Sequence, residues 1–323
     1  MRAVMCREFG EPEVLTVEEV PDPVPGPHDA VVRMRASSVN FPDVLFVANK
    51  YQITIPPPFS PGSEFAGDVV AVGSEVTDVA VGDRVFGATA VGAFADLVCV
   101  PAAGLHRLSD GLSYEAAAAF WVAYATSYHS LVGVAGVRSA DTVLVLGAAG
   151  GVGLAAVQLA KVLGARVIAA ASSADKLEVC REHGADELID YAQDNLRERL
   201  KQVAPGGVDV VIDPVGGPFA EQALRGLSQG GRYVVVGFAS GEIPKLPANL
   251  ILLKSAIVRG FEMRTHDQID HEGRLRGDAE LMALFERGAI APHIGATFPL
   301  ERAAEALRWV ADRRATGKVL IVP

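Results

Sequence analysis

Four glycines fall within seven residues of this chain, at 147–153. A short run of β-forming apolar residues, 142–146, precedes them, and apolar residues recur at helical spacing over 152–163. A strand, a glycine turn and a helix in this order form the phosphate-binding unit of dinucleotide-binding domains, where backbone N–H groups meet a pyrophosphate. The same turn could serve only to pack a helix on a sheet, but its flanks favour nucleotide binding. The run AAGGVG matches the G-x-G-x-x-G fingerprint with alanine in the first place, and the candidate pyrophosphate residues are Gly150, Gly151, Val152 and Gly153.

The next predicted strand, 166–171, bears on the choice of nicotinamide cofactor. Domains specific for NAD place Asp or Glu at the end of this strand, on the ribose hydroxyls, whereas this chain has Ala171 there. Ser172, Ser173 and Lys176 follow, and their two hydroxyls and one cation suit a 2′-phosphate. The serines could instead only cap the helix that starts at residue 174, a role that is compatible with phosphate binding. We therefore expect NADPH rather than NADH.

Downstream of the glycine turn, strand patterns alternate with helix patterns, which indicates right-handed crossovers and a parallel sheet. Gly237 ends one of these strands, at the carboxyl edge where such sheets bind ligands. The predicted strands of this region are 142–146, 166–171, 188–190, 208–213, 232–237 and 256–258.

Residues 1 to about 120 instead resemble a series of short strands with glycine punctuation, which is typical of a compact barrel-like module. We expect a helix at 112–131 to carry the chain into the parallel-sheet domain, and a last strand, 319–322, to return it to the first domain. Helices are predicted near 278–288 and 301–313, and a polar loop at 266–277. The expected domains are 1–121, completed by 265–323, and 122–264.

Composition excludes several classes of protein. The net charge of −10 argues against a nucleic-acid-binding surface. Cys6, Cys99 and Cys180 lie far apart, so neither a disulfide framework nor a clustered metal site is expected. No signal-peptide pattern and no membrane-spanning apolar run is present, so we expect a soluble cytoplasmic protein.

Several ordered motifs together resemble the medium-chain dehydrogenase/reductase superfamily, in its zinc-free quinone oxidoreductase branch, over essentially the whole chain. The resemblance implies a GroES-like β-rich catalytic domain, built from both chain ends, and a Rossmann cofactor domain with a doubly wound parallel sheet. It also implies a homodimer that joins the two Rossmann sheets edge to edge. The motifs are SVNFPD (38–43), PGSEFAG (61–67), VGDRV (81–85), GAAGGVG (147–153), GADELIDY (184–191), DPVGG (213–217) and RATGK (314–318).

The zinc-containing relatives carry a ligand cysteine and a ligand histidine where this chain has Asn40 and Ser63. An amide and a hydroxyl are not ordinary zinc ligands, so we expect no metal. Zinc makes alcohol oxidation possible by polarising the oxygen. Without it, an acceptor that is already electron-poor is favoured, either a quinone or an alkene conjugated to a carbonyl.

The resemblance also assigns site residues. Asn40 and Thr126 would orient the carboxamide, although Thr126 could equally bond the preceding turn of its own helix. Tyr51 matches a tyrosine that lines the cleft and could donate a proton, although it could also be packing. Val47 and Asn49 depart from the arginine and glycine of many relatives, which leaves substrate contacts open. The further cofactor residues that the resemblance implies are Tyr191, Gly237, Phe238, Phe261, Met263 and Arg314.

The function expected first is hydride transfer from NADPH to a quinone. The nearest alternative is NADPH-dependent reduction of an activated C=C bond in an enone, alkenal or enoyl thioester; a thioester of coenzyme A would need a basic patch, for which Arg274 and Arg276 are candidates. A protein that binds NADPH without catalysis is a third possibility. A zinc alcohol dehydrogenase is the least favoured.

Overall fold

A computed structural model describes residues 1–323, which form two compact units. The first unit contains Met1–Val122 and Pro292–Pro323, and the second contains Ala123–Ala291. The chain thus crosses to the second unit within one helix, α3 (Trp121–Tyr128), and returns at residue 292 rather than at the expected 265.

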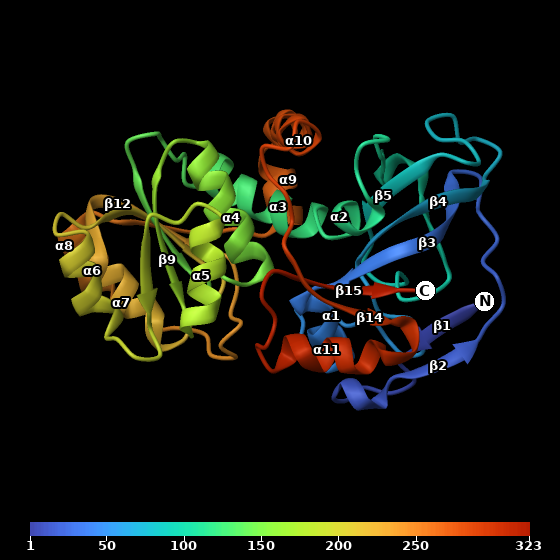
Figure 1. Ribbon diagram of the computed structural model, residues 1–323, viewed down its shortest axis with the longest axis horizontal. Helices are drawn as coiled ribbons and strands as arrows, with labels where there is room; N and C mark the ends of the chain where they lie inside the picture. The colour runs from blue at the N-terminus through green and yellow to red at the C-terminus, as the bar shows by residue number, and fades with distance from the viewer. The chain divides into compact units, whose positions relative to one another are not determined.

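The first unit is a mainly antiparallel β structure (Figure 1). Its seven-stranded sheet runs in the order β14-β15-β3-β4-β5-β7, with β6 also paired to β3, and β1 pairs with β2 in a second, two-stranded sheet. The strands are β1 (Arg2–Met5), β2 (Thr16–Glu19), β3 (Asp29–Val39), β4 (Glu64–Val72), β5 (Arg84–Ala88), β6 (Leu97–Pro101), β7 (Leu105–Arg107), β14 (Ile294–Pro299) and β15 (Lys318–Val322). The helices are α1 (Phe41–Val47), α2 (Tyr114–Ala118) and α11 (Ala303–Ala311), with 3₁₀ turns at Pro12–Val14, Ala102–Gly104 and Leu300–Arg302.

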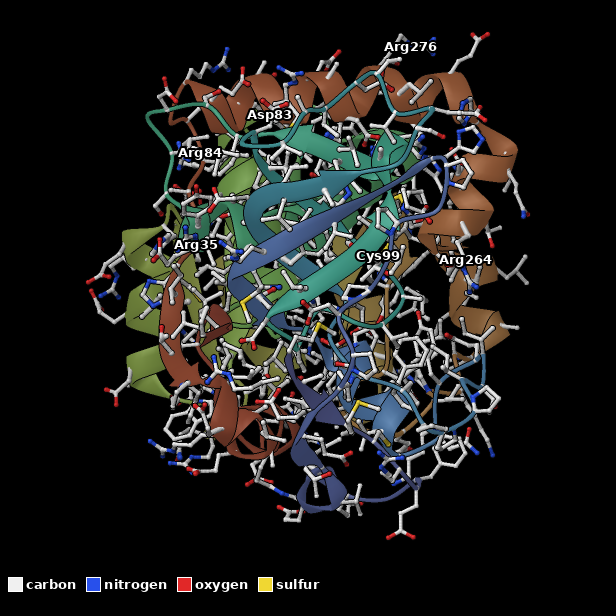
Figure 2. All side chains as sticks on the ribbon, turned by 90° about the vertical axis from the view of Figure 1, so that its right-hand side faces the viewer. Arg35, Asp83, Arg84, Cys99, Arg264 and Arg276 are labelled. Carbon is white, nitrogen blue, oxygen red and sulfur yellow. The ribbon has the colours of Figure 1, made fainter.

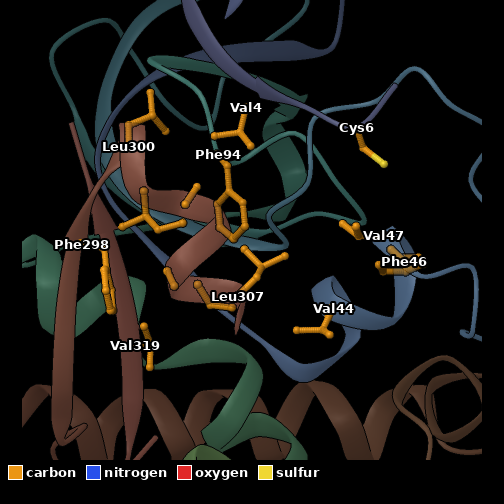
Figure 3. Packing of buried hydrophobic residues seen from close by; sticks show 14 of the residues in the cluster. Val4, Cys6, Val44, Phe46, Val47, Phe94, Phe298, Leu300, Leu307 and Val319 are labelled. Atoms are coloured by element: carbon orange, nitrogen blue, oxygen red, sulfur yellow. The ribbon is translucent and has the colours of Figure 1, made fainter. Parts of the chain in front are cut away.

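The predicted last strand is confirmed as β15, which pairs antiparallel with β3 through Val319 and Val39. Beside it, the C-terminal helix α11 packs Leu307 into an apolar core that it shares with Val44 of α1 and Phe94 (Figure 3). Burial of such side chains contributes roughly 1.5–3 kcal/mol each. The two ends of the chain are therefore joined in one core, as the expected GroES-like domain requires.

The second unit contains a six-stranded parallel sheet in the order β10-β9-β8-β11-β12-β13 (Figure 1). Leu144 and Ile168 belong to a buried cluster with the helices α6 to α8, and the alternate residues Val143 and Val145 are buried as well. A sheet covered on both faces explains the continuous apolar runs. Its strands are β8 (Thr142–Leu146), β9 (Arg166–Ala171), β10 (Glu187–Asp190), β11 (Val208–Asp213), β12 (Leu227–Val235) and β13 (Ile257–Gly260). Its helices are α4 (Gly151–Val162), α5 (Ala174–Glu182), α6 (Leu196–Val203), α7 (Pro218–Gly226), α8 (Ala248–Lys254), α9 (Met263–Ile269) and α10 (His271–Glu286).

The predicted single helix at 112–131 is interrupted in the structure. Helix α2 ends at Ala118, α3 begins at Trp121, and a π-helical turn at His129–Val134 follows α3 directly. None of the helices is both long and apolar enough to cross a bilayer.

The prediction of a loop at 266–277 is wrong, because these residues, apart from the N-cap Asp270, belong to α9 and α10. Glu262 caps α9 and Asp270 caps α10, each by accepting backbone N–H groups of the first turn. Asp278 of α10 also accepts a hydrogen bond from buried His129, with 2.8 Å between Nε2 and Oδ1. Arg276, in contrast, extends from the outer side of α10 (Figure 2). Polar composition thus reflects caps and one exposed helix face rather than a loop.

Candidate functional site

The carboxyl edge of the parallel sheet gathers most of the predicted cofactor residues. Because the strands are parallel, the segments that follow them all emerge at the same edge. In sheet order, Tyr191 follows β10, and Ser172, Ser173 and Lys176 follow β9. Gly150, Gly151, Val152 and Gly153 follow β8. Gly237 and Phe238 follow β12, and Phe261 and Met263 follow β13.

The glycine turn after β8 has a backbone conformation that suits a phosphate-binding site. Gly147 has a φ of +57°, and the Gly150 N–H donates to the Gly147 carbonyl at 2.9 Å. A Cβ at Gly153 would lie 2.2 Å from that same carbonyl oxygen, so only glycine fits there. Gly150 is the N-cap of α4 and offers no side-chain acceptor to the first turn of the helix. The first N–H groups of α4 therefore suit a pyrophosphate.

The end of β9 provides hydroxyls and a cation, and the nearest acidic residue, Asp175, lies in the first turn of α5. Ala171 is buried, and Ser172 follows it on the surface. Ser173 is the N-cap of α5, with its Oγ accepting the Lys176 N–H at 3.4 Å, so the alternative capping role is present. Tyr191 lies beside this strand end, because its N–H donates to the Ala171 carbonyl at 3.0 Å. Its ring packs against the ring of Phe219, with centroids 4.2 Å apart.

At the opposite end of the edge, Gly237 follows β12 and donates its N–H to the Asp213 carbonyl at 3.2 Å. Phe261 follows β13 and donates its N–H to the Val235 carbonyl at 2.9 Å. Phe238 is partly exposed, whereas Phe261 is buried. Met263 begins α9. These residues form one wall of the edge, next to the loop that follows β11.

Thr126 lies on α3, which is tied to the glycine turn by its neighbour Ser127. The Ser127 hydroxyl lies 2.8 Å from the Ala123 carbonyl and also 2.8 Å from the Val152 carbonyl. The residue that bonds the preceding turn of α3 is thus Ser127. Thr126 itself is partly exposed and lies one residue from the contact with α4. Ser127 was missed in the sequence because its role depends on a contact between α3 and α4.

Asn40 belongs to a buried polar cluster of the first unit. Its Oδ1 accepts a hydrogen bond from the Lys318 ammonium at 2.6 Å, and its Nδ2 donates to Ser63 at 3.2 Å and to Glu64 at 3.3 Å. Lys318 also forms an ion pair with Glu64, 3.0 Å away. Glu64 is fully buried and accepts further hydrogen bonds from Ser38 at 2.6 Å and from the Val122 N–H at 2.8 Å. Asn40 retains one lone pair on Oδ1 for a ligand.

Asp43 is buried beneath this cluster, in the first turn of α1. Its Oδ2 accepts the Asn40 N–H at 2.7 Å as part of a capping box, while its Oδ1 has no hydrogen-bond partner. Burial raises the pKa of Asp43 to about 7, against the smaller opposing effects of the Asn40 N–H and of Ser63. An uncompensated buried oxygen favours the protonated carboxyl.

Tyr51 and Arg314 form packing contacts elsewhere in the first unit. The Tyr51 ring lies 4.6 Å from the Phe46 ring, at the margin of the apolar core, which agrees with the packing alternative. The Arg314 guanidinium lies 3.6 Å above the ring of Trp309. This pair lines an open pocket of about 380 Å³ with Arg308 and Glu13.

Glu64, Lys318 and Asp213 are charged residues at these sites that were not among the predicted site residues. Each belongs to a motif that the sequence shows, PGSEFAG, RATGK and DPVGG. A charged residue directly at the end or start of a predicted strand was the available signal. What could not be recognised was the partner, because Lys318 and Asn40 are 278 residues apart.

The doubly wound sheet with its glycine turn defines the second unit as a dinucleotide-binding domain. Residues 26–110 match the family "Alcohol dehydrogenase GroES-like domain", and residues 151–275 match the family "Zinc-binding dehydrogenase". The chain is 38% identical to a quinone oxidoreductase-like protein 2 homolog of Nematostella vectensis, over 99% of this chain and 88% of that protein. It is 37% identical to a quinone oxidoreductase of Pseudomonas aeruginosa, over 100% and 99% of the two chains. The crystal structure of an Escherichia coli quinone oxidoreductase complexed with NADPH superposes with a TM-score of 0.91 at 30% identity, covering all of both chains.

The protein therefore consists of a GroES-like unit and a Rossmann unit. It belongs to the quinone oxidoreductase branch of the medium-chain dehydrogenase/reductase superfamily, which confirms the resemblance seen in the sequence.

Proposed function

We propose that this protein is an oxidoreductase that transfers a hydride from NADPH to a quinone. The observation that carries the proposal is the carboxyl edge of its Rossmann sheet. There a glycine turn suited to pyrophosphate adjoins the end of β9, where Ala171 takes the place of the acidic residue of NAD-specific domains and Ser172, Ser173 and Lys176 follow. The relatives named quinone oxidoreductases, one of them solved with NADPH, support the same cofactor and acceptor.

We assign the residues of the chain to the parts of the cofactor as follows. Ser172, Lys176 and Tyr191 would hold the 2′-phosphate, and the first N–H groups of α4 the pyrophosphate. Gly237 and Phe238 would line the nicotinamide side, with Phe261 and Met263 behind them. Asn40, Thr126 and Arg314 remain proposed cofactor contacts. When bound, NADPH supplies the hydride, and one further proton from water or the Tyr51 hydroxyl completes the hydroquinone.

We further propose that the reaction needs no metal. The positions that hold zinc ligands in relatives carry an amide and a hydroxyl, Asn40 and Ser63. The Lys318 ammonium, 2.6 Å from the amide oxygen, adds a positive charge that repels a divalent cation. An electron-poor quinone accepts a hydride without the help of a Lewis acid. Oxidation of an alcohol, in contrast, depends on a Lewis acid that polarises its oxygen.

The proposal is tested by steady-state assays with NADPH and either 9,10-phenanthrenequinone or an enone, before and after treatment with a chelator. We expect the larger kcat/KM with the quinone and no change after chelation. A larger value with the enone would favour the alternative reductase of C=C bonds. The thioester version of that alternative has lost one candidate, because Arg274 is bound between Asp267 and Asp278.

Replacement of Lys176 by alanine should weaken NADPH binding by roughly ten- to a hundredfold, since a charge-assisted hydrogen bond contributes about 1.5–3 kcal/mol. NADH, which lacks the 2′-phosphate, should bind the variant as it binds the unchanged protein. Cofactor fluorescence titration measures both affinities. Lys201→Ala, on the surface of α6, serves as the matched control and should change neither. Equal losses for both cofactors with Lys176→Ala would refute the assignment.

We propose a homodimer formed through β13. This strand ends the sheet, so one of its sides has no neighbouring strand. Leu252, Leu253 and Ile257, which are 78%, 69% and 51% exposed, form apolar surface on β13 and the preceding α8. A second copy could pair with the free edge and cover these side chains. Light scattering should show a dimer that Ile257→Arg with Leu252→Glu converts to a monomer, while Ile269→Glu on α9 leaves it intact. A monomeric unchanged protein would contradict the proposal.

We also propose a cytoplasmic location. Cys6, Cys99 and Cys180 are all free thiols, which persist in reducing compartments. Burial raises the pKa of Cys180 to about 12, so that thiol stays protonated and unreactive. Cell fractionation tests this location directly.

A further inference from the structure

Asp213, the last residue of β11, is a buried carboxylate held by three donors. Its Oδ1 accepts the backbone N–H groups of Val215 and Gly216, both at 2.8 Å. Its Oδ2 accepts the hydroxyl of Tyr233 on β12 at 2.5 Å. Burial raises the pKa of Asp213, and burial together with the neighbouring carboxylate raises the pKa of Tyr233. A buried carboxylate without hydrogen-bond donors is energetically unfavourable. The chain after β11 is therefore held in the conformation that keeps these donors in place.

The same residue joins two loops of the carboxyl edge. The Asp213 carbonyl accepts the Gly237 N–H, and the Pro214 carbonyl accepts the Ala239 N–H at 3.0 Å. Gly216 adopts a φ of +68°, which turns the first loop back toward the second. The loops 213–217 and 236–242 are therefore joined by hydrogen bonds, and Asp213 lies where they meet.

This joined pair of loops lies at the switch point of the sheet. Strand β11 is the neighbour of β8, although two other strands separate them in the sequence. Val215 lies against the glycine turn, since a Cβ on Gly147 would come within 2.7 Å of its Cγ2. Dinucleotides cross doubly wound sheets at this crevice. The adenine-side residues after β9 lie on the other side of β8.

We infer that Asp213 is a positioning residue for the nicotinamide half of the cofactor. Through Val215, Gly216 and Tyr233 it fixes the loops that form the nicotinamide side of the crevice. The inference rests on the proposed NADPH site. It adds to that site a residue that acts on the nicotinamide side and is not expected to contact the adenine half. Loss of Asp213 should therefore weaken the binding of the nicotinamide half of the cofactor and leave the binding of the adenine half unchanged.

The test compares the binding of NADPH with that of adenosine 2′,5′-bisphosphate, which carries only the adenine half. Asp213→Ala should raise the Kd of NADPH about tenfold or more and change that of the bisphosphate less than about twofold. At saturating NADPH the kcat with a quinone should fall by about ten- to a hundredfold, because a displacement of about 1 Å has that effect. Tyr233→Phe should act in the same direction with a smaller change.

Two controls separate positioning from a general loss of structure. Asp213→Asn keeps an oxygen for the two N–H groups and offers its amide to the Tyr233 oxygen, so it should bind NADPH within about threefold of the unchanged protein. Asp209→Ala removes a carboxylate at the opposite end of β11, where Asp209 accepts the Thr142 N–H at 2.8 Å. This variant should lower thermal stability and leave the ratio of the two affinities unchanged.

The outcomes are distinguishable. If the unchanged protein binds neither ligand, the proposed NADPH site itself is refuted. If it binds both, and Asp213→Ala weakens both equally or neither, the positioning role of Asp213 is overturned while the NADPH site stands. Only a selective loss for NADPH, restored in Asp213→Asn, supports the inference.

Discussion

Replacement of Lys318 by methionine is expected to lower the free energy of unfolding of the first unit by about 3–5 kcal/mol. The substitution leaves the fully buried Glu64 carboxylate without its only cationic partner, the Lys318 ammonium 3.0 Å away. It also removes the donor to Asn40 Oδ1. Breaking a buried ion pair from one side costs far more than the pair contributes, because the remaining charge cannot be hydrated.

Urea unfolding measures this loss in the relevant unit, since both tryptophans, Trp121 and Trp309, lie in the first unit and report on it by fluorescence. The double variant Lys318→Met with Glu64→Gln removes both charges and should recover part of the stability. Lys50→Met serves as the matched control, because the Lys50 ammonium is exposed and 4.0 Å from its carboxylate partner; it should change stability by less than about 0.5 kcal/mol. A loss below about 1 kcal/mol with Lys318→Met would show that Glu64 does not depend on this cation.

Asp43→Asn should stabilise the first unit in a manner that grows with pH. The carboxyl is fully buried, and burial raises its pKa from the ordinary 3.8 to about 7. Between these two values the unfolded chain releases the proton while the folded chain keeps it, so the folded protein loses stability as pH rises. The loss approaches about 4 kcal/mol near pH 7 and is constant above it. Asparagine has no such dependence.

Urea unfolding from pH 4.5 to 8, again followed by tryptophan fluorescence, gives the difference between the variant and the unchanged protein. We expect this difference to shift in favour of asparagine up to about pH 7 and then to level off. Asp110→Asn, at a fully exposed side chain of the same unit, serves as the matched control. A flat difference for Asp43→Asn would mean that Asp43 is ionised in the folded protein across this range.

Local pattern predicted most of the second unit. The apolar runs 142–146, 166–171 and 208–213 are confirmed as β8, β9 and β11, because a strand buried on both faces must be apolar at successive positions. The glycine turn was recognisable because its steric requirement is local: Gly147 and Gly153 approach one another within a single turn. The parallel sheet then followed from the alternation of strand and helix patterns.

Prediction failed where the decisive partner was remote. Residues 266–277 resemble a loop by composition, yet Asp278 accepts a hydrogen bond from His129, and α9 and α10 stay within the second unit. The chain consequently returns to the first unit at residue 292 rather than at 265. A helix whose polar residues are caps and buried partners cannot be distinguished from a loop without those partners.

The sequence by itself determined the family, the fold class and the glycine turn, because each motif that carries them is a run of neighbouring residues. Only the tertiary structure decided which charges are buried and paired. Pairing of β15 with β3 brings Lys318 to Asn40 and Glu64, and pairing of β11 with β12 brings Tyr233 to Asp213. The physical reason is that hydrogen bonds and ion pairs act over about 3 Å in space, whatever the separation of their residues in the sequence.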